Sequence, residues 1–298
     1  MLVSVLAALL SLAASPVPRP QAFTPGPVSF DIDSATFTPD GATVYFDRLE
    51  GSGSTIVLAR RAGDGWSAAV AAPFSGAWSD KDPALSPDGA FMIFVSNRPA
   101  QPGGKPLDLV RADGSVRIGQ GAQLWRVDRV GDGWGQPMHL NAAVNDGTRL
   151  YSPSVAGDGS IYFQRPDPVS HTFRIVRSQL LGDRYQPPIP VAIGPADSDE
   201  RDPAIAPDES FMVYSANYGP KDQPNRLYIA FRDQGRWGAP VDLGEAVNHD
   251  GAEGPHLGPD ARSVYFDAAL PGPDGKPGPS RIWRLDLTPW LEAHRRAR

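Results

Sequence analysis

The chain has 298 residues, of which 41% are hydrophobic, and a formal net charge of −6 at pH 7. This length allows one large β domain or two smaller ones. The acidic balance argues against nucleic-acid binding, because no basic stripe is available to replace phosphate counterions. The lack of cysteine excludes disulfides, thiolate metal sites and cysteine nucleophiles.

Residues 1–22 are expected to form a signal peptide or a disordered N-terminus. Leu2–Ala14 are apolar or small and carry no charge. This run has the length of a signal-peptide hydrophobic region and is too short to span a bilayer. No Lys or Arg precedes it, and Pro16 is awkward for cleavage. The prediction is a periplasmic or secreted protein without a transmembrane segment.

A pattern of about 50 residues then occurs five times, and repeats of this length are typical of propellers. Each copy has a polar start, small and apolar residues, a Pro-Asp-Gly-like turn and a strand with aromatic residues. The copies start at Asp33, Asp82, Tyr151, Asp202 and Glu253, and their aromatic pairs end at Phe46, Phe94, Phe163, Tyr214 and Phe266. A third strand, a tight turn and a short Pro-containing strand follow, so each copy predicts a four-stranded propeller blade.

The interval after Phe94 is longer than the others, and its Pro- and Gly-rich stretch 99–122 is interpreted as a loop insertion. It is too short for the four strands of a sixth blade. The fifth copy stops after its third strand at Leu287. Because an empty fourth-strand position would leave an unpaired edge, Pro27–Ile32 is expected to fill it.

These patterns predict an all-β fold. We expect a five-bladed β-propeller of four-stranded antiparallel blades over residues 23–290, closed by an N-terminal strand. Residues 291–298 are expected to form a basic C-terminal tail.

The Ser/Ala-Pro-Asp-Gly turn followed by a Tyr-Phe strand resembles the WD40-like β-propeller repeat family of the TolB type. The resemblance covers residues 27–287 and is closest at Asp82–Asn97. The third copy lacks the turn proline, and the fourth has Glu209 in place of glycine. The family implies periplasmic residence and a scaffold that binds proteins or small ligands, without implying one activity.

Loops that enter the first strands and loops that join the second and third strands should open on one face of such a ring. The binding residues expected at this channel mouth are Asp82, Asp202, Asp250, Glu253, His249 and His256. Their carboxylates suit a cation, a basic peptide or a sugar. The alternative is that the recurring acids accept backbone N–H groups where each blade begins. His249 and His256 flank Asp250 and Glu253, which leaves a metal undetermined.

Searches for catalytic motifs find no Gly-x-Ser-x-Gly elbow, His-Glu-x-x-His pair, phosphate loop or dinucleotide fingerprint. We expect a non-catalytic, monomeric binding or scaffold protein without a cofactor. Its partner would be a protein, a small molecule or a carbohydrate, bound on the loop-rich face. The alternative is a carbohydrate-active hydrolase or lyase with two channel-mouth carboxylates, which sequence spacing does not test. No catalytic residue is assigned, and enzymatic activity stays an open question.

Overall fold

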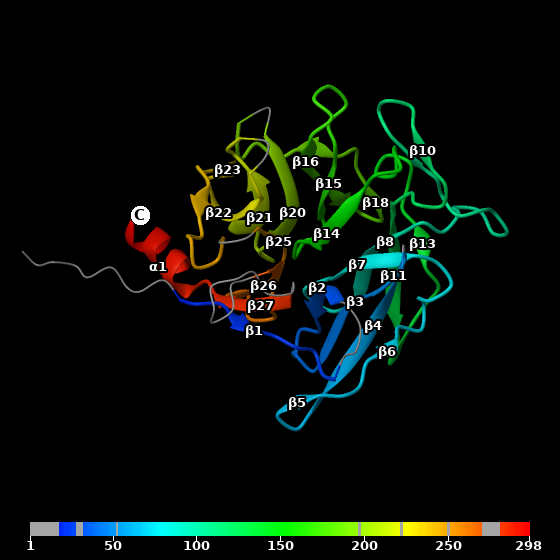
Figure 1. The fold of residues 1–298 in the computed structure, drawn as a ribbon, viewed down its shortest axis with the longest axis horizontal. Helices are drawn as coiled ribbons and strands as arrows, with labels where there is room; N and C mark the ends of the chain where they lie inside the picture. The colour runs from blue at the N-terminus through cyan, green and yellow to red at the C-terminus, as the bar shows by residue number, and fades with distance from the viewer. Residues whose placement is uncertain are drawn as a thin grey trace, which may run out of the picture.

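The computed structural model describes residues 18–27, 32–51, 53–195, 198–220, 223–248, 251–269 and 281–298. These residues form antiparallel sheets that surround a central channel as five blades. Figure 1 shows the innermost strand of each blade gathered at the centre and the short outer strands at the periphery. The prediction of an all-β five-bladed propeller is confirmed.

Every blade has three longer strands and a short outer strand, which in three blades consists of two separate segments. Blade 1 contains β2 (Ile32–Phe37), β3 (Thr43–Glu50), β4 (Gly53–Ala62), β5 (Gly65–Trp66) and β6 (Val70–Ala71). Blade 2 contains β7 (Asp80–Leu85), β8 (Phe91–Ser96), β11 (Gln123–Val130), β12 (Gly133–Trp134) and β13 (Met138–His139). Blade 3 contains β14 (Tyr151–Val155), β15 (Ile161–Pro166), β16 (Phe173–Ser178) and β19 (Ile189–Pro190), and the hairpin of β17 (Leu180–Leu181) and β18 (Arg184–Tyr185) extends from it.

The last two blades follow the same plan. Blade 4 contains β20 (Asp199–Ile205), β21 (Phe211–Asn217), β22 (Arg226–Asp233), β23 (Arg236–Trp237) and β24 (Val241–Asp242). Blade 5 contains β25 (Ala252–Leu257), β26 (Ser263–Ala268), β27 (Arg281–Asp286) and β1 (Gln21–Ala22).

The aromatic residues of the second strands form the centre of the blades. Their side chains are fully buried at Phe46, Phe94, Phe163, Tyr214 and Phe266. Aromatic residues of the outer turns pack between neighbouring blades. Trp134 of blade 2, for example, donates a 3.2 Å hydrogen bond from Nε1 to the Tyr45 hydroxyl of blade 1. Burial of large aromatic side chains on both faces of each sheet supplies much of the stability of such a ring.

The ring is closed by β1 rather than by the predicted segment Pro27–Ile32. Gln21 and Ala22 pair with Arg284 and Trp283 of β27. Ile32 already belongs to β2, and residues 28–31 lie outside the described part of the chain. The two-residue strand is secured by Phe23, whose N–H donates to the Ile282 carbonyl. The Phe23 ring also packs against Phe37, Trp66 and Tyr265.

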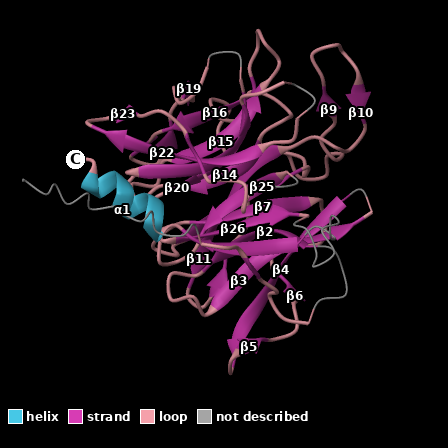
Figure 2. Ribbon diagram, turned by 60° about the vertical axis from the view of Figure 1, so that its left-hand side comes forward, coloured by secondary structure: helices cyan, strands magenta, loops and turns pink. Residues whose placement is uncertain are grey.

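Two further segments differ from plain loops. The insertion after β8 forms a hairpin of β9 (Leu109–Val110) and β10 (Val116–Arg117). The C-terminal residues form the helix α1 (Thr288–Arg296), which Figure 2 shows at the edge of the domain. Proline in its first turn and basic residues in its last turn are favourable positions. The expected basic tail, 291–298, is therefore the second part of this helix and its end.

Among the described residues, we find no helix that is long and apolar enough to cross a membrane. The apolar run Leu2–Ala14 lies outside those residues. The pairing of β1 with β27 places Gln21 and Ala22 in the propeller. The propeller therefore begins at or before Gln21, whereas the predicted boundary put residues 1–22 outside it.

Candidate functional site

Each innermost strand contains a β-bulge at the same place. The bulged residues adopt positive φ values of 48° to 59°, and they are Ser34, Asp82, Ser152, Asp202 and Gly254. In four blades proline follows, where its missing N–H is not needed because the ladder is interrupted. This register aligns Asp82 with Asp202. Asp33 and Glu253 lie one residue before the bulged residue of their strands. The four acids, which have equivalent places in the sequence repeat, therefore occupy two different structural positions.

The bulge N–H groups donate to side chains that project into the channel, and four of these acceptors come from the preceding blade. The Asp82 N–H donates to Asp47 Oδ2, the Ser152 N–H to Asp82 Oδ2, the Asp202 N–H to Gln164 Oε1 and the Gly254 N–H to Asp202 Oδ2. The Ser34 N–H donates to its own neighbour, Asp33 Oδ1, at 2.8 Å. Four of these bonds tie one blade to the next, and all five satisfy N–H groups that the bulge removes from the ladder.

Asp202 is the most heavily bonded of the predicted site residues. Its Oδ1 accepts the Ser152 hydroxyl at 2.7 Å, and its Oδ2 accepts the Ser215 hydroxyl at 2.6 Å and the Gly254 N–H at 3.4 Å. Asp82 accepts one backbone N–H, from Ser152 at 2.9 Å. This geometry supports the alternative in which these two recurring acids serve the scaffold.

A cavity of about 800 Å³ opens at the channel mouth. All five blades contribute to its wall, and the acidic residues that line it are Asp33, Asp82, Asp202, Glu253 and Asp267. Aliphatic side chains of Ile32, Leu49 and Ile282 line it as well. Of the predicted site residues, Asp82, Asp202 and Glu253 line this cavity, whereas Asp250 and His249 lie outside the described residues.

Burial and mutual repulsion favour the protonated form of several of these acids. Burial raises the pKa of Asp267 well above its usual value, and the neighbouring Asp33 carboxyl adds to the increase. Burial, with repulsion from Asp82 and Asp33, does the same for Asp47. The pKa of Asp82 is also raised, chiefly by burial, and that of Glu253 is raised by partial desolvation of its carboxyl group at the cavity wall and by repulsion from Asp202 and Asp33. Burial and repulsion between like charges both favour the neutral form of these carboxyl groups.

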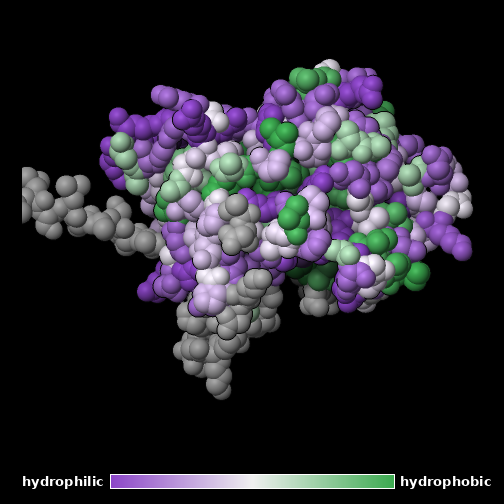
Figure 3. All heavy atoms as spheres, turned by 90° about the horizontal axis from the view of Figure 1, so that it is seen from above, coloured by the Kyte–Doolittle hydropathy of each residue, from purple (hydrophilic) through white to green (hydrophobic). Residues whose placement is uncertain are grey.

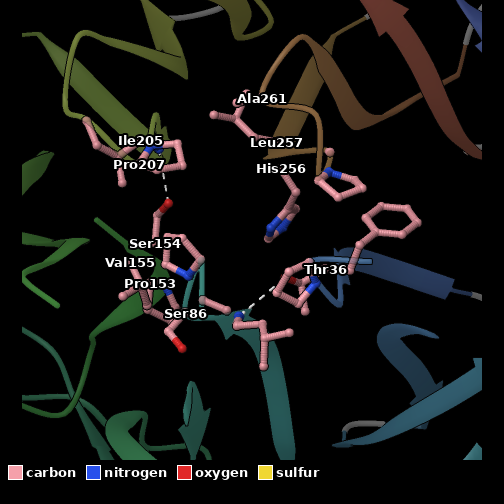
Figure 4. Close-up of a pocket in the computed structure, with 17 residues that line it drawn as sticks. Thr36, Ser86, Pro153, Ser154, Val155, Ile205, Pro207, His256, Leu257 and Ala261 are labelled. Atoms are coloured by element: carbon pink, nitrogen blue, oxygen red, sulfur yellow. Dashed lines mark hydrogen bonds between the residues drawn. The ribbon is translucent and has the colours of Figure 1, made fainter. Parts of the chain in front are cut away.

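His256 lies deeper in the channel, in a second cavity of about 110 Å³. Figure 4 shows its ring pointing into this cavity beside Thr36. Burial lowers the pKa of the imidazole, which keeps it neutral at neutral pH. The equivalent residues of the other blades are smaller: Thr36, Ala84, Ser154 and Ala204. His256 is thus an asymmetric feature of the channel wall, removed from the mouth where the sequence placed it.

Asp33, Asp47 and Asp267 were not among the predicted site residues. The sequence nevertheless carries a signal for two of them, because Tyr45-Phe46-Asp47 and Tyr265-Phe266-Asp267 are the same triplet. Since alternate residues of a strand share a face, an acid after a buried Phe must point toward the opposite face from its ring. In the described part of the chain, no group of three or more His, Asp or Glu side chains is arranged to hold a metal ion.

The exposed hydrophobic side chains are distributed rather than gathered at the mouth. Val70, Met138, Ile189 and Val241 lie on the outer strands of four different blades. On the face seen in Figure 3, hydrophobic spots are separated by hydrophilic residues. Scattered apolar residues of this kind are normal for a protein surface, so the mouth cavity is the stronger candidate site.

No family model and no curated protein matches the chain. Among solved structures, a protein of unknown function from Dyadobacter fermentans is similar over 91% of this chain and 82% of its own, with 16% identity and a TM-score of 0.53. TolB from Acinetobacter baumannii matches 70% of this chain and 53% of its own, with 17% identity and a TM-score of 0.37.

A putative TolB from Agrobacterium tumefaciens matches 87% of this chain and 91% of its own, with 16% identity and a TM-score of 0.40. The chain spans about half the length of the Acinetobacter protein. At these identities the likeness is one of fold. The chain is a five-bladed β-propeller, and the solved structures similar to it include TolB proteins.

Proposed function

We propose that the protein is a non-catalytic binding or scaffold protein whose partner docks on the loop-rich face and reaches into the mouth cavity. The observation that carries this proposal is the cavity of about 800 Å³ with side chains from all five blades in its wall. A rigid ring that presents a concave, polar-lined mouth between loops is a usual place for a binding site.

Glu253 is the acid in this cavity best suited to contact a partner. It is exposed and lines the mouth, and no hydrogen bond joins its side chain to another described residue. Asp82 and Asp202, by contrast, are engaged in the bonds between blades. A substitution at Glu253 should therefore change partner binding with less effect on stability than a substitution at either aspartate.

The alternative of a carbohydrate-active hydrolase or lyase needs two carboxyl groups at catalytic spacing. Glycosidases use separations of about 5–9.5 Å. Two carboxyl groups of the cavity, those of Asp82 and Asp202, accept hydrogen bonds from Ser152, Ser215 and Gly254. These bonds favour a structural role over a catalytic one for the two aspartates.

We also propose export to the periplasm or the medium, as the apolar run Leu2–Ala14 suggests. Removal of a signal peptide would have to leave Gln21 and Ala22 in place, because β1 closes the ring. The N-terminal sequence of the mature protein should therefore begin before Gln21. A mature chain that begins after Ala22 would contradict this part of the proposal.

Affinity capture with matched variants tests the binding proposal. The full-length protein, Glu253→Lys at the mouth and Glu292→Lys on α1 would be compared as baits in the same cell-envelope extract. The partner should be retained by the wild type and by Glu292→Lys, and reduced at least tenfold with Glu253→Lys. Equal retention by all three baits, or retention by none, would contradict a partner at the mouth.

A further inference from the structure

We infer that the cavity around His256, at the end of the channel opposite the mouth, binds a small uncharged molecule with a hydroxyl group on an apolar body the size of a phenol ring. The imidazole of His256 is the hydrogen-bonding partner of that hydroxyl. This inference goes beyond the proposed function, because the cavity around His256 shares no lining residue with the mouth cavity.

The cavity lies on the face formed by the turns between the first and second strands. Each innermost strand runs from the bulge at the mouth toward this face, so its later residues line the cavity. Its rim contains the prolines of four of the repeated turns, Pro39, Pro87, Pro207 and Pro259, and the first, third and fourth of these are exposed. Because proline fixes its own φ, this rim is rigid and formed before a ligand arrives.

The lining of this cavity favours an uncharged ligand. No Asp, Glu, Lys or Arg is among the described residues that line it, and most of the wall is apolar, with Phe37 and Leu85 among its side chains. The aspartate after each rim proline is held within its own turn; Asp40, for example, accepts the Thr38 hydroxyl and the Ala42 N–H. A charged ligand would lose its hydration here without meeting an opposite charge, which is costly.

The hydroxyl groups in the wall already have partners in the scaffold. Thr36 Oγ1 accepts the Leu85 N–H at 3.3 Å, and Ser154 Oγ accepts the Ile205 N–H at 3.0 Å. The Ser86 hydroxyl is hydrogen-bonded within its own turn and to the strand that follows. The oxygens of all three hydroxyls therefore serve the propeller itself.

His256 differs from these residues, because no hydrogen bond joins its ring to another described residue. The side chain is half-buried and points into the cavity (Figure 4). A neutral imidazole offers one N–H donor and one acceptor nitrogen. The smaller residues of the other blades at this position, Thr36, Ala84, Ser154 and Ala204, leave space in front of the ring. A ligand that bonds to the imidazole satisfies a polar group that the scaffold leaves open.

The volume of the cavity limits this ligand to a small molecule. An apolar protein cavity of about 150 Å³ accepts benzene. The cavity around His256, with about 110 Å³ and an open rim, therefore has room for one six-membered ring. A hydroxyl on such a ring can donate to one imidazole nitrogen or accept from the other. Phenol combines these properties.

Calorimetry on the full-length protein tests the inference, with phenol as the probe. Toluene is the matched ligand, because a methyl group replaces the hydroxyl on the same ring. We expect saturable binding of phenol, and binding of toluene that is weaker by about tenfold. In nitrogen NMR spectra, phenol should also shift the imidazole signals of His256, which are identified by their loss in His256→Ala. Absence of phenol binding, or equal binding of phenol and toluene, would overturn the inference.

Variants assign the binding to this cavity. His256→Ala should bind phenol and toluene equally, because the hydrogen-bonding partner is gone. Ala84→Leu, whose larger side chain fills part of the cavity, should weaken the binding of both ligands by about tenfold. His171→Asn, in the exposed loop between β15 and β16, is the matched control and should change neither affinity. An unchanged preference for phenol in His256→Ala, or an unchanged affinity in Ala84→Leu, would refute the site.

The mouth variant Glu253→Lys separates this inference from the proposed function. It should lose the captured partner and still bind phenol as the wild type does, since the two cavities share no residue. Loss of phenol binding in Glu253→Lys would contradict a separate site around His256.

Discussion

Replacement of Asp202 with alanine should destabilise the propeller strongly, because this carboxylate connects three blades. It accepts the hydroxyls of Ser152 and Ser215 at 2.7 and 2.6 Å and the more distant Gly254 N–H at 3.4 Å. Hydrogen bonds to charged groups contribute about 1.5–3 kcal/mol each. With two short bonds lost and some repulsion from Glu253 relieved, the free energy of unfolding should fall by about 3–5 kcal/mol.

The backbone conformation of Asp202 makes a further comparison possible. Its φ is 50°, a region that Asp adopts more readily than Ala and that Gly adopts without strain. Asp202→Gly loses the same hydrogen bonds as Asp202→Ala but avoids the strain. The glycine variant should therefore be the more stable of the two, by about 1 kcal/mol.

Denaturation in urea, followed by tryptophan fluorescence, measures these differences. Glu253→Ala is the matched control, since it removes an acid from the same cavity that has no hydrogen bond to a described residue, and it should cost less than about 1 kcal/mol. Equal stability of the Asp202 and Glu253 variants would refute a scaffold role for Asp202. A glycine variant less stable than the alanine variant would refute the argument from its φ.

Three further predictions follow from the contacts of single residues. Phe23→Ala removes the ring that anchors β1 and should lower the free energy of unfolding by about 2–4 kcal/mol in the same assay. The pKa of Glu209 is lowered, because the hydrogen bonds from Arg177 and Tyr162 outweigh the effect of burial. Its stabilisation should thus be full at neutral pH and lost as the pH falls below 4.5, and Glu209→Gln should lack this acid dependence. Burial raises the pKa of Asp47, so its contribution to stability should fall as the pH rises above 3.8; the wild type should therefore lose stability relative to Asp47→Asn between pH 4 and 8, which denaturation across this range measures.

The fold could be predicted because its signals are strong and periodic. Five buried aromatic pairs, each followed by a turn, predict five blades without any knowledge of contacts. The closing strand has no such signal. The strand β1 consists of Gln21 and Ala22 alone. Its position depends on Phe23, which packs between Tyr265 and Phe37, two residues that are distant from each other in the sequence.

The site could be predicted less well, because a bulge shifts the register by one residue. Asp33 and Asp82 both begin a repeat, and a pattern comparison treats them as equivalent. In the structure Asp82 occupies the bulge and accepts a backbone N–H from the next blade, while Asp33 lies before the bulge, faces Asp47 in the ladder and accepts the N–H of its own neighbour Ser34. The repeated acids in the sequence therefore belong to two structural positions, the bulge and the residue before it, which have different roles.

When each strand position is compared across the five blades, the acidic residues are found to be distributed asymmetrically around the ring. At the position before the bulge, blades 2, 3 and 4 have Lys81, Tyr151 and Arg201, whereas blades 1 and 5 have Asp33 and Glu253. After the aromatic pair, the same two blades have Asp47 and Asp267, where the others have Val95, Gln164 and Ser215.

Blades 1 and 5 meet where the chain closes the ring, so the excess of acid lies beside β1 and Phe23. Ring closure and the proposed partner binding then depend on the same junction, because Phe23 belongs both to the packing of the closing segment and to the wall of the cavity. A change that loosens β1 should therefore weaken partner binding at the mouth before the rest of the ring unfolds. A change of equal cost in blade 3, far from this junction, should leave the binding intact.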